Sequence, residues 1–110
     1  MKTLAIALAF SLVLLADDAP QKVTGEVVDA HCYLSRGAHG EEHAGCANAC
    51  LSRDVPAALV TADGTIYLLL NEKPVSLKEK IAGKAGKTMT ATGKVVERNG
   101  LKAIQVATIE

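Results

Sequence analysis

The chain has 110 residues, and its 12 basic and 12 acidic residues cancel to a formal net charge of zero. This balance excludes the basic surface that binds nucleic acid or anionic lipid, and one phenylalanine, two tyrosines and no tryptophan are too few for a base-stacking platform. The length suits a single small domain.

Residues 1–16 predict a secretory signal peptide. Lys2 precedes an apolar run from Leu4 to Leu15, and small and acidic residues follow it, which is the layout of a cleaved export signal. The run is shorter than the roughly 20 residues that a membrane-spanning helix needs. We therefore expect cleavage after residue 16, or at the latest after residue 19, and a periplasmic or secreted domain of residues 17–110 without membrane attachment.

Five segments of this domain predict β-strands. Residues 21–30 are rich in β-branched side chains, and Asp63-Gly64 separates apolar segments near 57–61 and 65–70. Asn99-Gly100 separates the last two strands. Asp-Gly and Asn-Gly between apolar runs are the strongest short-range hairpin signals, so the sequence predicts two hairpins.

One short helix is predicted between the third and fourth strands. Ser76 and Glu79 have the spacing of a capping box, Leu77 and Ile81 lie one turn apart, and Gly83 is a helix-stop signal. The resulting order of elements resembles that of the OB-fold, a small five-stranded barrel. Small SH3-like barrels and open five-stranded sheets share parts of this order.

The predicted fold class is therefore mainly β, an OB-fold-like five-stranded barrel. Residues 31–55 form an insert between strands one and two, on the face that OB-folds use for binding. All three cysteines and all three histidines of the chain lie in residues 31–50 of this insert. Because fold does not determine function, these side chains have to carry the functional argument.

Residues 41–53 predict a helix within the insert. On an ideal helix His43, Cys46 and Cys50 fall within an arc of about 60°. His43 and Cys50 are also about 10.5 Å apart along the axis, which strains a single tetrahedral metal site. Either Gly45 breaks the helix, or the ion takes Cys46 with only one of its two neighbours and Cys32 or a second histidine completes the set.

A metal site is the interpretation that uses most of these residues. Thiolates and imidazoles are ligands for zinc, and thiolates also suit copper. The predicted ligands are Cys32, His43, Cys46 and Cys50, with His31 and His39 as further donors and Asp29 as an outer partner of the site. A solvent-facing strand residue is the alternative for Asp29. The pattern favours a binding or structural role over catalysis.

Two other functions remain open at this point. A disulfide from Cys32 to Cys46 or Cys50 would close a loop of roughly 15 to 19 residues and stabilise the fold by about 3 kcal/mol. The protein would then be a disulfide-stapled interaction module with one spare thiol and a protein partner of unknown identity. A thiol redox enzyme with Cys46 or Cys50 as nucleophile near His43 is the third possibility.

The segment GEVVDAHC, residues 25–32, is followed by the pattern H-x-x-C-x-x-x-C and then by the Asp63-Gly64 hairpin. This arrangement resembles a group of small exported bacterial proteins, mostly uncharacterised, over about residues 23–109. The resemblance implies that four residues of the insert belong together, and these are Cys32, His43, Cys46 and Cys50.

Overall fold

The structure is a computed structural model that describes residues 19–110. The predicted signal peptide, residues 1–16, lies outside the described residues. Within residues 19–110, no helix has the length and apolar character needed to cross a membrane.

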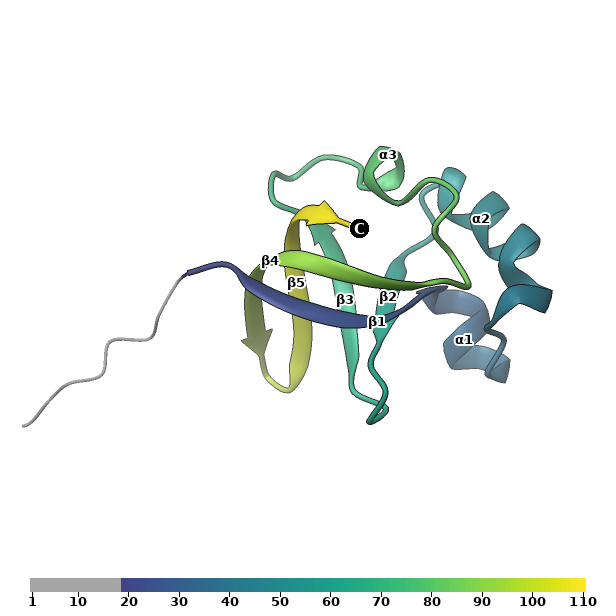
Figure 1. The fold of residues 1–110 in the computed structure, drawn as a ribbon, viewed down its shortest axis with the longest axis horizontal. Coiled ribbons are helices and arrows are strands. Elements are labelled where there is room, and N and C mark those ends of the chain that lie inside the picture. Colours follow the sequence, from purple (N-terminus) through teal and green to yellow (C-terminus); the bar gives the residue numbers. More distant parts are fainter. Residues whose placement is uncertain (1–18) are drawn as a thin grey trace, which may run out of the picture.

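The described chain forms a closed five-stranded barrel with the strand order β1-β2-β3-β5-β4 (Figure 1). Strands β3 and β5 run parallel, and the other neighbouring pairs are antiparallel. The mainly β, OB-fold-like barrel with a partly helical insert is confirmed. In chain order the elements are β1 (Gln21–Asp29), α1 (Ala30–Arg36), the 3-10 helix η1 (Glu41–His43), α2 (Ala44–Ser52), β2 (Ala57–Val60), β3 (Ile66–Asn71), α3 (Lys78–Ile81), β4 (Thr88–Arg98) and β5 (Leu101–Ile109).

Strand β1 closes the barrel because its two halves pair with different neighbours. Its first half pairs with β4 and its second half, from Glu26 to Asp29, pairs with β2. At the bend lies Gly25, where a Cβ atom would stand 2.5 Å from the carbonyl oxygen of Val60. Only glycine allows this approach of the two backbones, so Gly25 serves the barrel rather than a ligand.

Both predicted hairpins form, with different turns. Asn99 and Gly100 both have positive φ, 51° and 87°, as a two-residue type I′ turn requires. The other loop is longer, since the Thr61 N–H donates to the Thr65 carbonyl at 2.9 Å and the left-handed position is taken by Gly64. The turn chemistry of the sequence therefore set the two hairpins.

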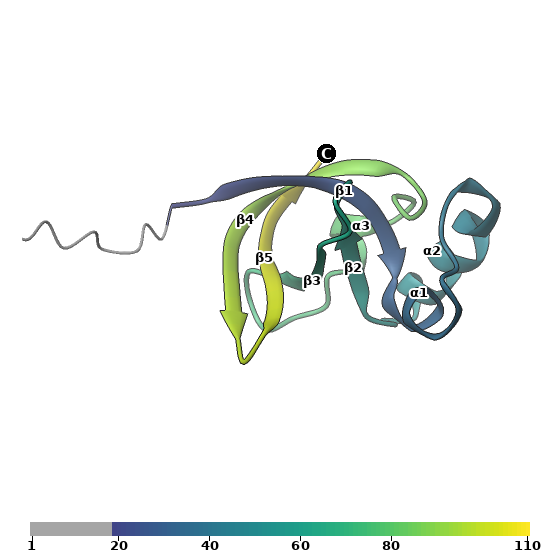
Figure 2. The same ribbon diagram turned by 90° about the horizontal axis from the view of Figure 1, so that it is seen from below.

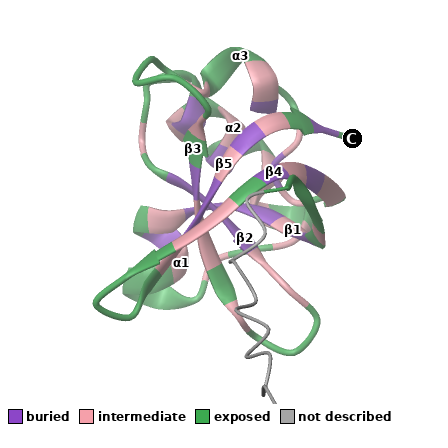
Figure 3. Ribbon diagram, turned by 90° about the vertical axis from the view of Figure 1, so that its left-hand side faces the viewer, coloured by how far each residue is buried: buried purple, intermediate pink, exposed green. Residues whose placement is uncertain are grey.

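The barrel interior is filled by aliphatic side chains. Val27, Leu59, Ile104 and Val106 are fully buried, and Figure 3 shows the buried positions concentrated where the strands cross. Ile81 of α3 is buried in the same core, so this short helix covers one end of the barrel. Apolar burial of this kind is the main source of stability in a small domain.

The predicted capping box of α3 does not form. Leu77 occupies the N-cap, and no side chain caps the helix there. The Ser76 hydroxyl instead accepts a hydrogen bond from the Lys78 N–H at 3.2 Å and donates one to the Asp54 carboxylate. Because α3 begins at Lys78, Ser76 lies one residue before the N-cap position, and Ser76 and Glu79 do not have the spacing of a capping box in this helix.

The insert lies beside the barrel, at the end of β1 (Figures 1 and 2). A helix was predicted over 41–53, and the structure has η1 followed by α2, with Gly45 inside α2 rather than at a break. The additional helix α1 follows β1 directly. Ala47 and Leu51 are the buried residues of α2 and hold it against the barrel core.

Candidate metal centre

The candidate site is built where β1 runs into α1. Asp29, the last residue of the strand, is the N-cap of α1, and its Oδ1 accepts from the Cys32 N–H at 2.7 Å. The helix ends at Gly37, which has a φ of 69° and donates its N–H to the carbonyls of Cys32 and Tyr33. An aspartate N-cap and a glycine C-cap are standard helix boundary signals, and they fix the Asp29 and Cys32 side chains relative to each other.

Polar contacts bring the second half of the insert to the same place. The Gly40 N–H donates to Glu26 Oε2 at 2.7 Å, just before η1 begins. The Asn48 side chain of α2 accepts from the Ala85 N–H at 3.0 Å, in the segment that leads into β4. A Cβ on Gly86 would lie 2.8 Å from the Gly40 carbonyl oxygen, so that segment also packs closely on the start of η1.

These contacts place the His43 side chain against Asp29 at the end of β1. Its Nε2 lies 2.9 Å from Asp29 Oδ2, and a ligand atom from each of Asp29, Cys32 and His43 lies within 4.8 Å of the other two. Asp29 is 0% and Cys32 8% exposed, and the His43 side chain is 14% exposed. We call these three residues the Asp–Cys–His group.

The carboxylate of Asp29 is charged although it is buried. Burial alone would raise its pKa, but hydrogen bonds from the Cys32 N–H and from His43 outweigh burial and lower the pKa below its ordinary value of 3.8. A buried carboxylate is stable only when such partners replace water. Asp29 therefore places a negatively charged oxygen beside Cys32 and His43.

The thiol of Cys32 is in the opposite situation. Burial raises the pKa of Cys32 above its ordinary value of 9.0, and the neighbouring Asp29 carboxylate raises it further, while Arg36 partly offsets this and Cys50 adds to it. The protein alone thus keeps Cys32 protonated, which does not suit a nucleophile. A metal ion that binds there has to displace the proton, since the thiolate is the ligand.

The two other cysteines lie outside the Asp–Cys–His group. Cys46 is exposed on α2, and Cys50 is half-buried near the end of that helix, where its Sγ accepts from the Arg53 guanidinium at 3.6 Å. All three cysteines are free thiols, and residues 19–110 contain no disulfide. The predicted set of Cys32, His43, Cys46 and Cys50 is therefore brought together only in part.

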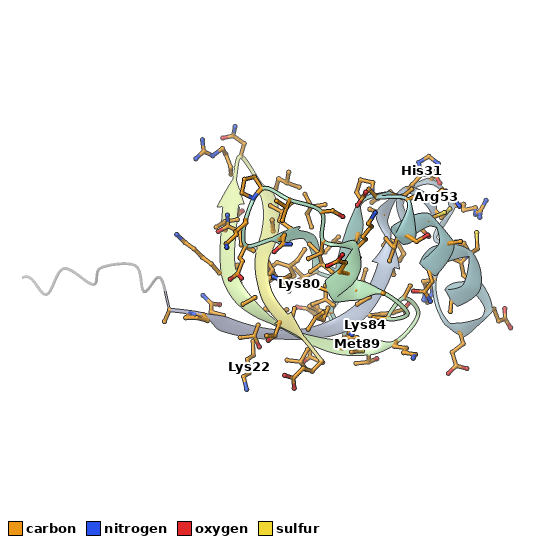
Figure 4. The ribbon with its side chains drawn as sticks, turned by 90° about the horizontal axis from the view of Figure 1, so that it is seen from above. Lys22, His31, Arg53, Lys80, Lys84 and Met89 are labelled. Atoms are coloured by element: carbon orange, nitrogen blue, oxygen red, sulfur yellow. The ribbon has the colours of Figure 1, made fainter. Side chains whose placement is uncertain are left out.

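The two remaining histidines also lie outside the group. His31 is exposed on α1 and lies at the outer edge of the insert, as does Arg53 (Figure 4). The His39 ring stands edge-on to Tyr33 at 6.1 Å, and its Nδ1 lies 3.1 Å from Glu26 Oε1. His39 thus takes part in the contacts that position the loop before η1.

Sequence reasoning gave Asp29 an outer role, whereas the structure places its carboxylate directly among the ligand atoms. A signal for this was present, because an aspartate followed by a helical stretch and a glycine predicts an N-cap. The contact with His43, 14 residues further along the chain, depends on the fold of the insert and has no local signal.

The three side chains of the group are of the kinds that bind metal ions. Five of the surface cavities formed by residues 19–110, with volumes of about 300 to 530 Å³, are lined by residues other than the Asp–Cys–His group. A carboxylate oxygen, a thiolate and an imidazole are all zinc ligands, with bond lengths of about 2.0 to 2.3 Å. The group therefore has the side-chain chemistry to hold a metal ion.

We compared the chain with protein-family models, with curated proteins and with solved structures, and none of them matches. The assignment of function consequently depends on the geometry and chemistry of the site.

Proposed function

We propose that the protein binds one zinc or copper ion through Asp29, Cys32 and His43, in a binding or structural role. The observation that carries this proposal is the convergence of an oxygen, a sulfur and a nitrogen ligand atom within 4.8 Å of one another. Ligand atoms around one tetrahedral zinc ion are about 3.3 to 3.8 Å apart. Small side-chain movements are sufficient to bring the three atoms to that spacing.

The ion would replace the hydrogen bond between Asp29 and His43. Their 2.9 Å separation is a few tenths of an ångström shorter than about 3.3 Å, the distance expected for two ligands on zinc. Binding therefore exchanges a shared proton for the cation and also removes the thiol proton of Cys32. Metal affinity should rise with pH, as it does wherever ligands must lose protons.

A bound ion would join two parts of the chain that are distant in sequence. Asp29 and Cys32 belong to the β1–α1 junction, and His43 is the last residue of η1, immediately before α2. The ion would thus fasten the insert to the barrel. A structural ion of this kind contributes its binding free energy directly to folding.

Elemental analysis and zinc titration of the purified protein test the proposal, with Cys32→Ser as the site variant and Cys50→Ser as the matched control. We expect about one ion per chain for wild type and Cys50→Ser, and affinity reduced at least about tenfold by Cys32→Ser. Wild type without bound metal, or equal affinity in all three proteins, would disprove the site.

We also propose that the protein is exported, on the strength of the predicted signal peptide in residues 1–16. Expression of the full chain in bacteria followed by cell fractionation and mass measurement tests this. We expect a periplasmic or secreted product that begins between residues 17 and 20, and retention in the cytoplasm when an arginine replaces Leu8. An uncleaved cytoplasmic wild-type product would contradict export.

A further inference from the structure

The outer face of the barrel carries an apolar row that crosses all five strands. The row consists of residues that are register neighbours from strand to strand, namely Val28, Ala58, Leu68, Ala103 and Val96. The residues next to them in the chain point into the barrel core, as Leu59, Leu69 and Ile104 do. Because side chains alternate between the two faces of a strand, the row lies on the outside of the barrel.

The two halves of this row differ in cover. Val28 and Ala58 lie close to the two ends of the insert in the chain, and both are almost fully buried. Strands β4 and β5 lie on the side of the barrel away from the insert (Figures 1 and 2), and there the row is open. A surface cavity of about 490 Å³, which we call the outer groove, is lined by Leu68, Leu70, Val96, Glu97, Arg98, Leu101, Ala103 and Gln105. Leu101 is 64% exposed, and an apolar surface of this kind on a small domain indicates a binding site.

Cationic side chains border the outer groove along β4. Lys94 and Arg98 each lie two residues from Val96 in this strand, so all three side chains share the outer face. Glu97 also borders the groove, but it lies beside Lys102 in the strand register, and a cross-strand neighbour of opposite charge offsets its charge. The ion pairs within residues 19–110 do not include Arg98. The guanidinium of Arg98 is therefore available to an anionic ligand in the groove.

We propose that the outer groove binds an aliphatic carboxylate, such as a free fatty acid, with its chain on Leu68, Val96 and Leu101 and its carboxylate on Arg98. The apolar lining is purely aliphatic and matches a hydrocarbon chain. A guanidinium binds a carboxylate through two parallel hydrogen bonds. The volume of the groove falls within the range of about 300 to 1,000 Å³ that is typical of small-ligand sites. This site is separate from the Asp–Cys–His group and does not depend on the proposed metal binding.

The dimensions of the outer groove favour a single lipid chain over a protein or a membrane surface. Neighbouring strands are about 4.8 Å apart, so the groove spans about 10 Å from β3 to β4, and the length from Ile66 to Leu70 is about 13 Å. A stable protein interface buries about 800 Å² on each side, which is several times this footprint. Anionic membranes are bound by clusters of about four to eight basic residues, whereas only Lys94 and Arg98 border the groove along β4.

Calorimetric titration of the purified protein with dodecanoate, kept below its micelle concentration, tests the inference. We expect one molecule to bind per chain in wild type, and binding at least about fivefold weaker in Leu101→Gln and in Arg98→Gln. Leu34→Gln and Arg53→Gln are matched controls, because both residues are exposed in the insert, and they should bind dodecanoate as wild type does. Dodecyltrimethylammonium, which has the same chain and a cationic head, should bind wild type more weakly than dodecanoate.

Several results would overturn the inference. These are the absence of saturable dodecanoate binding to wild type, equal affinities in wild type and Leu101→Gln, and equal affinities for the anionic and the cationic amphiphile. Sedimentation of wild type, but not of Leu101→Gln, with phosphatidylglycerol vesicles would instead assign the groove to a membrane surface. Dimerisation of wild type that Leu101→Gln abolishes would assign it to a second copy of the chain, and either result would overturn the fatty-acid site.

Discussion

The barrel and the insert, which in the structure comprises residues 30–56 between β1 and β2, are held in place by different forces. The barrel buries a continuous set of aliphatic side chains from all five strands, whereas the insert contributes only three buried apolar residues, Cys32, Ala47 and Leu51. Most of what positions the insert is polar, including Asp29 with His43 and Asn48 with the Ala85 N–H. The barrel is thus organised by burial and the insert by specific contacts.

The magnitudes of these forces differ as well. Burial of one large aliphatic side chain contributes about 1.5 to 3 kcal/mol, and a typical hydrogen bond contributes about 1 kcal/mol. Regions with few buried apolar contacts open independently of the global unfolding transition. We therefore expect the insert to be less stable than the barrel. A bound ion should raise the local stability of the insert to a value comparable with that of the barrel.

The largest effect is expected in the barrel core. Ile104→Ala removes a fully buried side chain and should lower the free energy of unfolding by about 2 to 5 kcal/mol. Urea denaturation measures this change, with Leu101→Ala as the control because Leu101 is 64% exposed. A loss below about 0.5 kcal/mol for Ile104→Ala would mean that the barrel core is not the main source of stability.

The second-largest effect on stability is expected from metal binding, and it should be concentrated in the insert. At a free zinc concentration one hundred times the dissociation constant, binding to the folded state adds about 2.7 kcal/mol. Hydrogen exchange should show the added protection at the amides of α1, η1 and α2. Added protection confined to the barrel strands would contradict a metal-fastened insert.

In the metal-free protein, loss of the Asp29 carboxylate should lower the free energy of unfolding. Asp29→Ala removes both the cap of α1 and the partner of His43, and we expect a loss of about 1 to 3 kcal/mol in the free energy of unfolding. Asp29→Asn retains an oxygen that can cap the helix, so its loss should be smaller by about 1 kcal/mol. Equal losses in the two variants would show that the cap contributes little.

The same carboxylate makes stability depend on acid pH. Because the pKa of Asp29 is lower in the folded protein than its ordinary value of 3.8, the unfolded chain takes up the proton first. The stabilisation is fully present above that value and is lost as the pH falls through the lower folded-state pKa. Hydrogen bonds from Thr61 and Thr65 also lower the pKa of Asp63, so Asp63 contributes to the same pH dependence. A comparison of wild type with Asp29→Asn isolates the contribution of Asp29.

Unfolding in urea between pH 2 and pH 7 provides that comparison. The stability difference between wild type and Asp29→Asn should be constant above about pH 5 and should shrink steadily below pH 4. A difference that stays constant down to pH 2 would show that Asp29 is not the group that titrates.

The smallest effect is expected at His39. Its side chain is 58% exposed, and removal of its contact with Glu26 in His39→Ala should cost no more than about 0.5 kcal/mol. Zinc affinity should change less than twofold. A tenfold loss of affinity would make His39 a ligand and would require a different arrangement of the site.

The sequence was most informative where local chemistry sets the structure. Asn99-Gly100 and Asp63-Gly64 marked both hairpins, since few residues other than glycine and asparagine accept positive φ. Strand β1 was recognisable from its β-branched residues. The order of these elements was then sufficient to predict an OB-fold-like barrel with its insert after the first strand.

The site could be predicted less completely because it depends on tertiary contacts. The clustering of cysteine and histidine pointed to the segment that carries Cys32 and His43, and helix geometry indicated that His43 and Cys50 would strain a single tetrahedral site. The contact of His43 with Asp29, however, depends on the hydrogen bond of Asn48 to the Ala85 N–H and on the close approach of Gly86 to Gly40. The Asp29 carboxylate entered the group through the same docking, so its role was visible only in the folded chain.

X-ray absorption at the zinc edge of the loaded wild-type protein tests the central claim most directly. Binding by Asp29, Cys32 and His43 predicts sulfur at about 2.3 Å together with nitrogen and oxygen at about 2.0 Å, and this sulfur contribution should fall in Cys32→Ser. A shell of nitrogen and oxygen alone, or one that Cys32→Ser leaves unchanged, would contradict the account.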